Sequence, residues 1–332
     1  MNHIAVLGSG SWGTALAFAA AQKAPRVTLW GHQNDAAETL NRTRENKRYL
    51  PGIKLPDTIA ATSDFYALTD AELVLAVVPS KALRQVALDL KDSGALRPDA
   101  ILLCCIKGIE MNTGLTMSGV LREIFPNNPI AVLSGPNHAE EIAKKLAAAA
   151  VIGSLDETVS LKLQEFFTLP WFRTYRSTDV TGIEWGGAVK NVFAIASGIS
   201  EGLGLGDNAR AALVTRGLAE MTRLGMAAGG RFQTFQGLSG VGDLIVTCYS
   251  KHSRNNRVGR LLGEGQTLSD IISHMNMVAE GVPNTESIHA AARRYNIRTP
   301  IIDQMYAILY EGKPCAAALT ELLSRDPRAE HD

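Results

Sequence analysis

Hydrophobic and polar residues are spaced differently in the two halves of this 332-residue chain. Up to about residue 180, short runs rich in valine, isoleucine, leucine and alanine alternate with stretches of helical periodicity. Continuous apolar runs of this length are typical of strands buried on both faces of a parallel sheet. We therefore expect a doubly wound α/β domain over residues 1–180. Its strands are expected at 3–10, 26–30, 73–79, 100–108, 129–136 and 148–153, and its helices at 13–24, 80–91 and 156–168.

From about residue 181 the strand-like runs stop and the apolar segments carry helical spacing. Pro283, Pro300 and Pro314 stand near the starts of three of these segments, where a helix tolerates proline. The sequence thus predicts an all-α second domain over residues 181–332, joined to the first through residues 175–182. The expected helices cover 182–201, 207–228, 256–263, 280–295, 300–311 and 315–324.

Composition narrows the class of protein. Hydrophobic residues make up 46% of the chain and the formal net charge is zero, which argues against nucleic acid as a partner. No apolar run has the pattern of a signal peptide or a membrane insertion. Cys104, Cys105, Cys248 and Cys315 show neither C-x-x-C nor zinc spacing, so we expect no metal and no disulfides. A cytoplasmic protein is predicted, and the apolar helical half favours a homodimer.

A glycine motif follows the first strand. Gly8, Gly10 and Gly13 form G-x-G-x-x-G, directly after a strand and at the opening of a helix. The first glycine permits a tight turn, the second lets the backbone approach a pyrophosphate, and the third allows close helix–strand packing. Phosphates then face the helix N-terminus, whose free N–H groups favour anions. We therefore predict a Rossmann-like dinucleotide-binding domain.

The end of the second strand bears on which dinucleotide is bound. An acidic residue there would hold the ribose 2′-hydroxyl and repel a 2′-phosphate, but residues 29–33 read Leu-Trp-Gly-His-Gln. Basic residues follow at Arg42, Arg44, Lys47 and Arg48. The sequence therefore predicts that NADP is accepted, alongside NAD. The alternative for any one of these residues is a solvated, charged helix face.

A lysine stands in the middle of the apolar segment 184–198. Lys190 and Asn191 share a helical face with small residues, which leaves room for a substrate. A desolvated lysine has a lowered pKa and can exchange a proton near neutral pH, as a general acid or base does. The alternatives are a side chain that reaches out to solvent, or one paired with Glu184 or Glu201.

Two further segments of the second half carry polar residues at useful spacing. Asp243 and Thr247 are neighbours on one helical face, where the carboxylate could orient a lysine. Asp243 could instead serve only as an N-terminal charge on its helix. Ser253 is a candidate N-cap, followed by Arg254 and Asn255. A helix start with a guanidinium and an amide favours a phosphate.

In the first half, two predicted strands end in loops that point to the same place. Ligands in open α/β sheets lie beyond the carboxyl ends of the strands, and Lys107 and Gly135 follow two such ends. Lys107 could bind a substrate oxygen there, the alternative being an ordinary strand-ending lysine. His138 is expected to be structural or exposed.

Taken in order, these motifs resemble the NAD(P)-dependent glycerol-3-phosphate dehydrogenases of the bacterial type. The resemblance extends from about residue 4 to 324. It rests on seven segments, at 8–17, 105–110, 133–141, 184–199, 240–248, 253–265 and 278–282. It implies reversible hydride transfer between NAD(P)H and dihydroxyacetone phosphate, giving sn-glycerol 3-phosphate for phospholipid synthesis.

The resemblance also implies roles for individual residues. Lys190 matches the proton donor, with Lys107, Asp243 and Thr247 around the reacting oxygen. Ser253, Arg254 and Asn255 match the phosphate end of the substrate site. Gly135, Asn137 and Asn191 are expected to line the substrate, although the family usually carries serine or threonine where this chain has Asn137. Positions implied to contact the cofactor, besides the three glycines of the motif, are Ser11, Trp12, His32, Tyr49, Lys107, Ala139, Arg254, Val278 and Glu280.

Two other functions remain open from the residues alone. A β-hydroxyacid dehydrogenase would share the two-domain architecture, but the predicted phosphate site at 253–255 argues against it. A non-catalytic protein that senses NAD(P) would leave Lys190, Asp243 and Thr247 without a common task.

Overall fold

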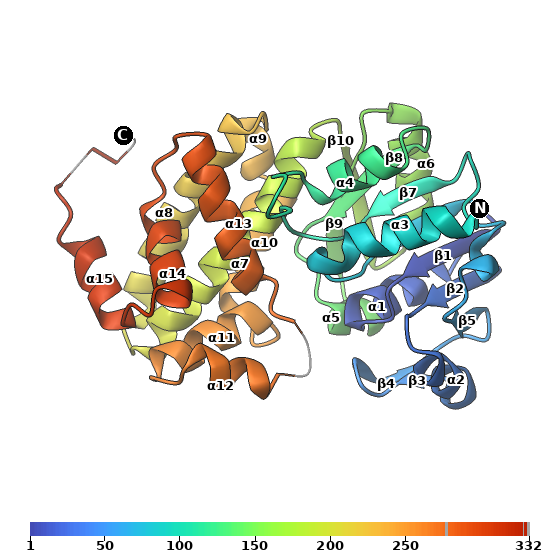
Figure 1. The fold of residues 1–332 in the computed structure, drawn as a ribbon, viewed down its shortest axis with the longest axis horizontal. Helices are drawn as coiled ribbons and strands as arrows, with labels where there is room; N and C mark the ends of the chain where they lie inside the picture. Colours follow the sequence, from blue (N-terminus) through green and yellow to red (C-terminus); the bar gives the residue numbers. More distant parts are fainter. Residues whose placement is uncertain (276–277, 328, 331–332) are drawn as a thin grey trace.

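The computed structural model describes residues 1–275, 278–327 and 329–330, and it places a sheet domain beside a helical domain (Figure 1). The eight strands of the main sheet follow the order β10-β9-β8-β7-β6-β1-β2-β5. Their bounds are β1 His3–Leu7, β2 Arg26–Trp30, β5 Ile59–Thr62, β6 Leu73–Ala76, β7 Ile101–Cys104, β8 Ile130–Ser134, β9 Ala148–Gly153 and β10 Phe172–Ser177. A separate small hairpin joins β3 (Glu45–Asn46) and β4 (Leu50–Lys54).

Helices cover both faces of this sheet, as the expected doubly wound fold requires. One face is covered by α1 (Ser11–Ala20), α5 (Ala139–Ala143) and α6 (Glu157–Phe167), and the other by α3 (Leu83–Ser93) and α4 (Met117–Ile124). The remaining elements of this half are α2 (Asn34–Thr43) and the 3₁₀ turns η1 (Phe65–Leu68) and η2 (Ser80–Ala82). The fold class predicted from the sequence is confirmed.

The order of strands reverses beside β1, and this places the ligand crevice. β1 pairs with β2 on one side and with β6 on the other, so the chain winds outward in both directions from this point. In such sheets ligands bind at the reversal, outside the carboxyl ends of the strands. The glycine motif follows β1 directly, so it lies in the crevice.

The sheet differs from the expected one in two respects. β9 runs antiparallel to β8, whereas the other pairs are parallel. The edge strands β5 and β10 were also not expected. In β10 the residues alternate between buried and exposed, as a strand with one covered face does, so the continuous apolar run used as a signal is missing.

The helical half is arranged around one long central helix (Figure 1). Helix α7 runs over Val180–Gly202, and 20 of its residues are buried. Around it lie α8 (Gly206–Ala227), α10 (Asp243–Tyr249), α11 (Arg254–Gly263), α13 (Gly281–Arg294) and α14 (Pro300–Tyr310). The shorter elements are α9 (Phe232–Phe235), the π-helical turn η3 (Leu238–Gly242), α12 (Leu268–Ser273) and α15 (Cys315–Leu323). No helix of the described residues is both long and apolar enough to span a membrane.

Glycines let α7 and α11 touch through their backbones. A Cβ atom at Gly198 would lie 2.0 Å from the carbonyl oxygen of Asn256, and one at Gly259 would lie 1.9 Å from that of Ile195. Real Cβ atoms do not come so close, so only glycine fits at either position. This contact fixes α11, which begins at Arg254, against the helix that carries Lys190.

The start of α7 packs on the sheet and its middle extends past it. Val180 and Ile183 belong to the same apolar core as Val132 of β8. Four residues later, a Cβ atom at Gly187 would lie 3.0 Å from the Oγ of Ser134, the last residue of β8. Lys190 follows within one further turn, so it lies just beyond the carboxyl end of the sheet.

Candidate functional site

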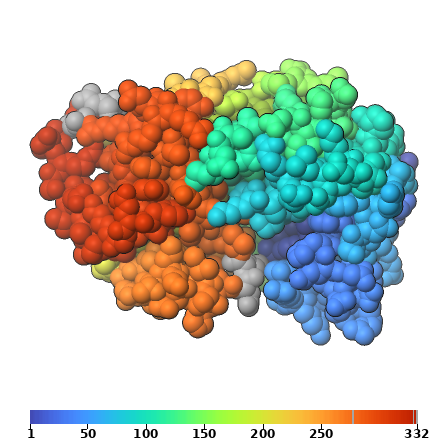
Figure 2. Space-filling view, in the orientation of Figure 1, coloured from blue at the N-terminus to red at the C-terminus, as the bar shows by residue number. Residues whose placement is uncertain are grey.

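A cleft of about 610 Å³ lies between the two domains at the carboxyl ends of the strands. In the space-filling view the surface recedes where the blue N-terminal segment faces the orange helices (Figure 2). This volume is within the range of small-molecule and cofactor sites. The candidate residues that line it are Gly8, Gly10, Ser11, Trp12, His32, Tyr49, Lys107, Asn137, Ala139, Lys190, Asn191, Asp243, Thr247, Ser253, Arg254, Asn255, Val278 and Glu280.

Two candidates, Gly13 and Gly135, are not among the residues that line the cleft. A Cβ atom at Gly13 would lie 1.8 Å from the carbonyl oxygen of Gly8, so this glycine serves the packing of α1 on its turn. Gly135 has a φ of 144°, a backbone conformation that favours glycine, and its carbonyl oxygen accepts a hydrogen bond from Lys107. Both therefore act through the backbone.

The glycine motif forms an anion-binding turn at the start of α1. Gly8 has a φ of 121°, and a Cβ atom there would lie 2.8 Å from the carbonyl oxygen of Val77 on the neighbouring strand's loop. At Gly10, by contrast, a Cβ atom would meet nothing within 4 Å, so the backbone is open to the cleft. Gly10 is the N-cap residue of α1 and supplies no side chain to the first N–H groups. These N–H groups are free to bind a phosphate.

The basic residues after β2 do not line the cleft. Arg44 donates to the carbonyl oxygen of Pro56 and lies 3.8 Å from Asp57, and Arg48 lies over the ring of Tyr49 at 5.1 Å. The cleft is bordered at this end by Trp30, Gly31, His32 and Tyr49. None of these four lining residues is acidic, as the sequence at the end of β2 indicated.

Lys190 is buried in the floor of the cleft, with 6% of its surface exposed. Its Nζ atom donates to the Oδ1 atom of Asp243 and, at 2.5 Å, to the Oγ1 atom of Thr247. Both alternatives weighed from the sequence are wrong. The side chain does not reach solvent, and Glu184 instead accepts hydrogen bonds from Ser118 of α4.

Glu201, the other acidic partner weighed for Lys190, lies 3.6 Å from Arg210. It stands near the end of α7, about three turns beyond the lysine. Its pairing therefore belongs to the outer end of the helix, away from the cleft.

Asp243 joins two lysines that come from different domains. Its Oδ2 atom accepts from the Nζ atom of Lys107 at 2.6 Å, while its Oδ1 atom accepts from Lys190. The carboxylate has no exposed surface, and Lys107 also donates to the carbonyl oxygen of Gly135 at 3.2 Å. Asp243 is the first residue of α10, so it also places its charge at a helix start.

The surroundings of Lys190 favour its neutral form. Burial, helped by the positive charge of Lys107, lowers the pKa of Lys190 to about 7 against the opposing attraction of Asp243. A lysine with this pKa gains and releases a proton at neutral pH. It is therefore suited to general acid–base catalysis.

The start of α11 forms the other polar end of the cleft. Ser253 is the N-cap, and its Oγ atom accepts from the backbone N–H of Asn256 at 3.2 Å, as expected. Arg254 follows in the cleft wall, where burial lowers the pKa of its guanidinium and Glu280 and Glu140 oppose that shift. A positive charge and free N–H groups thus meet at one helix end, which suits an anion.

Two asparagines beside Lys190 are held by internal hydrogen bonds. The Nδ2 atom of Asn255 donates to the Oδ1 atom of Asn191 at 2.9 Å, and its own Oδ1 atom accepts from the backbone N–H of Gly281.

In Asn137, the Nδ2 atom donates to the carbonyl oxygens of Pro136 and Ala149, while its buried Oδ1 atom has no partner among the described residues.

Ser80, a polar residue that contacts the cleft residue Glu280, was not foreseen from the sequence. Ser80 follows β6, and its Oγ atom donates to the Oε2 atom of Glu280 at 2.5 Å, which joins the two domains across the cleft. The rule that identified Lys107, a polar residue after a parallel strand, could have identified Ser80 as well.

His138 is half-buried beside His252, and burial together with Lys190 lowers its pKa. It lines the cleft, so it is neither fully exposed nor part of the core.

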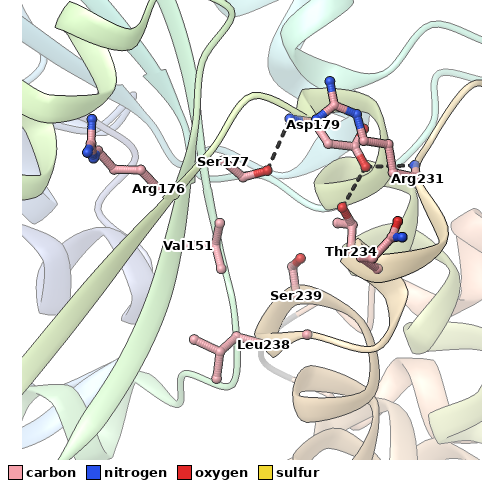
Figure 3. Close-up of a pocket in the computed structure, with 10 residues that line it drawn as sticks. Val151, Arg176, Ser177, Asp179, Arg231, Thr234, Leu238 and Ser239 are labelled. Atoms are coloured by element: carbon pink, nitrogen blue, oxygen red, sulfur yellow. Dashed lines mark hydrogen bonds between the residues drawn. The ribbon is translucent and has the colours of Figure 1, made fainter.

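A second cavity of about 380 Å³ lies at the junction between β10 and α7 (Figure 3). Its polar centre is Asp179, the N-cap of α7, whose carboxylate accepts from the backbone N–H groups of Gly182 and Arg231 and from the hydroxyl of Thr234. The carboxylate is thereby occupied by contacts within the protein. Asp179 therefore links the start of α7 to α9, and its carboxylate is not available to bind a ligand in this cavity.

Comparison with known proteins gives one family over almost the whole chain. Residues 3–160 match the family model described as the NAD-dependent glycerol-3-phosphate dehydrogenase N-terminus, and residues 179–320 match the model of its C-terminus. Curated relatives named glycerol-3-phosphate dehydrogenase [NAD(P)+] include one from Geobacter sp. (strain M21), 47% identical over 334 residues. Another, from Chlorobium limicola, is 45% identical over 332 residues. In both cases 99% of each chain is covered.

A solved structure has nearly the same fold. The crystal structure of glycerol-3-phosphate dehydrogenase from Coxiella burnetii superposes with a TM-score of 0.94 and 39% sequence identity, and the match covers 98% of this chain and 99% of that one.

Proposed function

The chain belongs to the NAD-dependent glycerol-3-phosphate dehydrogenase family, and from this premise we propose how its own residues carry out the reaction. The protein is an oxidoreductase that uses NAD(P) to interconvert glycerol 3-phosphate and its ketone, dihydroxyacetone phosphate. One observation supports the residue assignment above all. The shared carboxylate of Asp243, with a lysine on each side, lies in the same cleft as the glycine motif.

The residues of the glycine turn fit a dinucleotide. The open backbone at Gly10 and the free N–H groups at the start of α1 would hold the pyrophosphate, and Trp12, His32 and Tyr49 would border the rest of the cofactor. When bound, the cofactor supplies or accepts the hydride.

Lys190 handles the proton. In ketone reduction its ammonium donates to the carbonyl oxygen, and in alcohol oxidation its neutral amine accepts the hydroxyl proton. Asp243 keeps the two lysines in place, and the positive charge of Lys107 stabilises the negative charge that develops on the substrate oxygen. Thr247 fixes the direction of the Lys190 side chain through the hydrogen bond to Nζ.

The start of α11 holds the phosphate of the substrate. Arg254 supplies a guanidinium, and the N–H groups that follow Ser253 supply further donors. Asn137, Asn191 and Asn255 border the space between phosphate and reacting carbon. Binding of the phosphate at a fixed distance from Lys190 places the carbonyl group in a reactive position. This lowers the entropic cost of the reaction.

Substitution of the lysine tests this assignment. Lys190→Met keeps the length of the side chain and removes its proton. We expect loss of NADPH oxidation with dihydroxyacetone phosphate, while NADPH affinity, measured by quenching of tryptophan fluorescence, stays within about twofold. Lys144→Met, an exposed change, serves as the control. Substantial turnover in Lys190→Met would refute the role of Lys190.

The same assays separate the two other functions. Turnover of 3-hydroxyisobutyrate in place of glycerol 3-phosphate would indicate a β-hydroxyacid dehydrogenase. Tight NADPH binding without oxidation by any ketone phosphate would indicate a sensing protein. The lysine pair and the cationic start of α11 favour the dehydrogenase that acts on a phosphorylated substrate.

We also propose that the protein works in the cytoplasm as a homodimer. Cys104, Cys105, Cys248 and Cys315 are free thiols, as expected in a reducing compartment. Large apolar side chains are exposed on the helical half, among them Ile245 of α10, which is 49% exposed. Light scattering on the purified chain should give twice the chain mass of 35.6 kDa, and the mass of one chain would contradict the dimer.

A further inference from the structure

Helix α13 holds the loop that carries Lys107. This loop connects β7 to α4, and its backbone receives hydrogen bonds from two side chains of the helical domain. The Nδ2 atom of Asn284 donates to the carbonyl oxygen of Lys107 at 3.2 Å, and Arg294 donates to the carbonyl oxygens of Met111 and Thr113, both at 3.2 Å. The loop therefore depends on a helix from the other domain for its position.

Asn284 fits closely at this contact. Only 1% of its surface is exposed. A Cβ atom at Gly108, the residue after Lys107, would lie 3.0 Å from the Oδ1 atom of Asn284 and 3.0 Å from the Cβ atom of Ser80. A side chain at residue 108 would displace one of these groups. The glycine thus lets the amide reach the backbone beside Lys107.

The first residue of the same helix, one turn before Asn284, is linked to the neighbourhood of Lys190. The backbone N–H of Gly281, the first residue of α13, donates to Asn255, which in turn donates to Asn191. Asn191 is the next residue to Lys190. Amide hydrogen bonds at the first turn of α13 thus reach both the backbone of Lys107 and, through Asn255, the side chain of Asn191, and none of them passes through Asp243.

We propose that Asn284 is a positioning residue that sets the distance of Lys107 from Asp243 and thereby from Lys190. The proposal rests on the proposed role of Lys190 as proton donor. Asn284 itself is not among the residues that line the cleft. It acts by holding the backbone of Lys107, while the ammonium of Lys107 reaches Asp243 at 2.6 Å.

Loss of the Asn284 amide has a defined electrostatic consequence. When the loop relaxes, Lys107 moves away from Asp243, and the carboxylate is left to Lys190 alone. The charge of Lys107 lowers the pKa of Lys190 and Asp243 raises it, so the pKa of Lys190 rises in the variant. Among the described residues, His138 and Cys248 also interact with the charge of Lys190, and neither contacts the loop carbonyl.

The test compares Asn284→Ala with Ser287→Ala in the full chain. Ser287 is also a buried polar residue of α13, but its hydroxyl donates only to the helix's own backbone, at Asn284. For Asn284→Ala we expect kcat for dihydroxyacetone phosphate to fall about tenfold or more, with the KM for NADPH within about twofold. The alkaline limb of the reduction profile, plotted as kcat/KM against pH, should move to higher pH. Ser287→Ala should change neither quantity.

A second variant and a double-mutant cycle distinguish the proposed effect from a general loss of folding. Asn284→Ser keeps a polar group too short to reach Lys107 and should behave like Asn284→Ala. In a Lys107→Met background, Asn284→Ala should cause little further change, because the residue that it positions is gone. Unchanged kcat and an unmoved pH limb in Asn284→Ala, or full additivity with Lys107→Met, would overturn the proposal. These results would leave the role of Lys190 intact, since Lys190→Met tests that role separately.

Discussion

Lys107 and Lys190 approach the same carboxylate from opposite sides of the domain junction. Lys107 comes from the loop after β7 and Lys190 from the middle of α7, and Asp243 accepts from both. When Lys190 is protonated, two ammonium groups and one carboxylate leave an excess positive charge in a buried place. That charge suits a phosphorylated substrate whose reacting oxygen becomes negative. Neither domain alone contains both lysines.

Removal of the shared carboxylate should reduce catalysis. In Asp243→Asn the amide cannot balance two ammonium groups, so Lys190 loses its proton at a lower pH. We expect kcat for ketone reduction at neutral pH to fall about 100-fold or more, because each unit by which the pKa of Lys190 falls lowers its ammonium fraction about tenfold. Asp207→Asn, at an exposed position in α8, is the control. An Asp243→Asn enzyme with wild-type kcat would contradict the shared-carboxylate arrangement.

The two directions of the reaction should depend on pH in opposite ways. Burial lowers the pKa of Lys190 to about 7. Reduction needs the ammonium, so kcat/KM for dihydroxyacetone phosphate should fall as pH rises through about 7. Oxidation of glycerol 3-phosphate needs the neutral amine, so its kcat/KM should rise over the same interval. Initial rates in both directions from pH 5 to 9, at constant ionic strength, check this; parallel limbs would exclude Lys190 as the titrating group.

Arg254 should matter only when the substrate carries a phosphate. A hydrogen bond to a charged group contributes about 1.5–3 kcal/mol, so Arg254→Ala should lower kcat/KM for dihydroxyacetone phosphate about 10- to 100-fold. With unphosphorylated dihydroxyacetone the same variant should differ little from wild type. Arg257→Ala, one turn along α11 and exposed, provides the matched control. Equal losses with both substrates would assign Arg254 to the cofactor or to structure.

A buried glutamate outside the cleft should control stability against pH. Glu220 of α8 accepts from the backbone N–H groups of Ile301 and Ile302 at the start of α14. Burial raises its pKa from the usual 4.5 to about 7. The folded state therefore binds the proton more tightly, and the stability that this contributes is complete below pH 4.5 and lost as pH rises through about 7.

The Glu220→Gln variant lacks this titration. Over that interval, the free energy of unfolding of wild type should decrease by about 3 kcal/mol more than that of Glu220→Gln. Urea unfolding at pH 5 and pH 8 measures the difference, with the exposed Glu165→Gln as control. Identical pH dependence in Glu220→Gln and wild type would show that Glu220 does not titrate in this range.

Local patterns in the sequence were sufficient where the chemistry depends on neighbours along one element. The glycine motif, the pair Asp243 and Thr247, and the N-cap Ser253 all follow from short spacing rules, and all but Gly13 of the motif line the cleft with Lys190. The strand β10 could not be predicted because it lies at the sheet edge and alternates in polarity.

Contacts between distant segments were beyond the same rules. Ser80 and Glu280 are 200 residues apart, and Asn284 and Lys107 are 177 apart. Each residue has an ordinary local context, and only the packing of α13 against the loops of the first domain brings the partners together. Similarly, the sequence left open whether Lys190 pairs with an acidic residue on its own helix, and only the fold shows that its partner is Asp243.

The course of α7 along the sheet has one more consequence, for how the chain tolerates insertions. Between Ile183, level with Val132 in β8, and Gly187, level with Ser134, the helix advances about 6 Å, and the strand advances about as far over two residues. The helix and the strand thus advance by matching distances up to the edge of the sheet, just beyond which Lys190 lies. One residue added between 183 and 190 would turn the lysine by about 100° away from Asp243, so an insertion within that interval would break this contact, whereas one in a loop outside it would leave the helix in register.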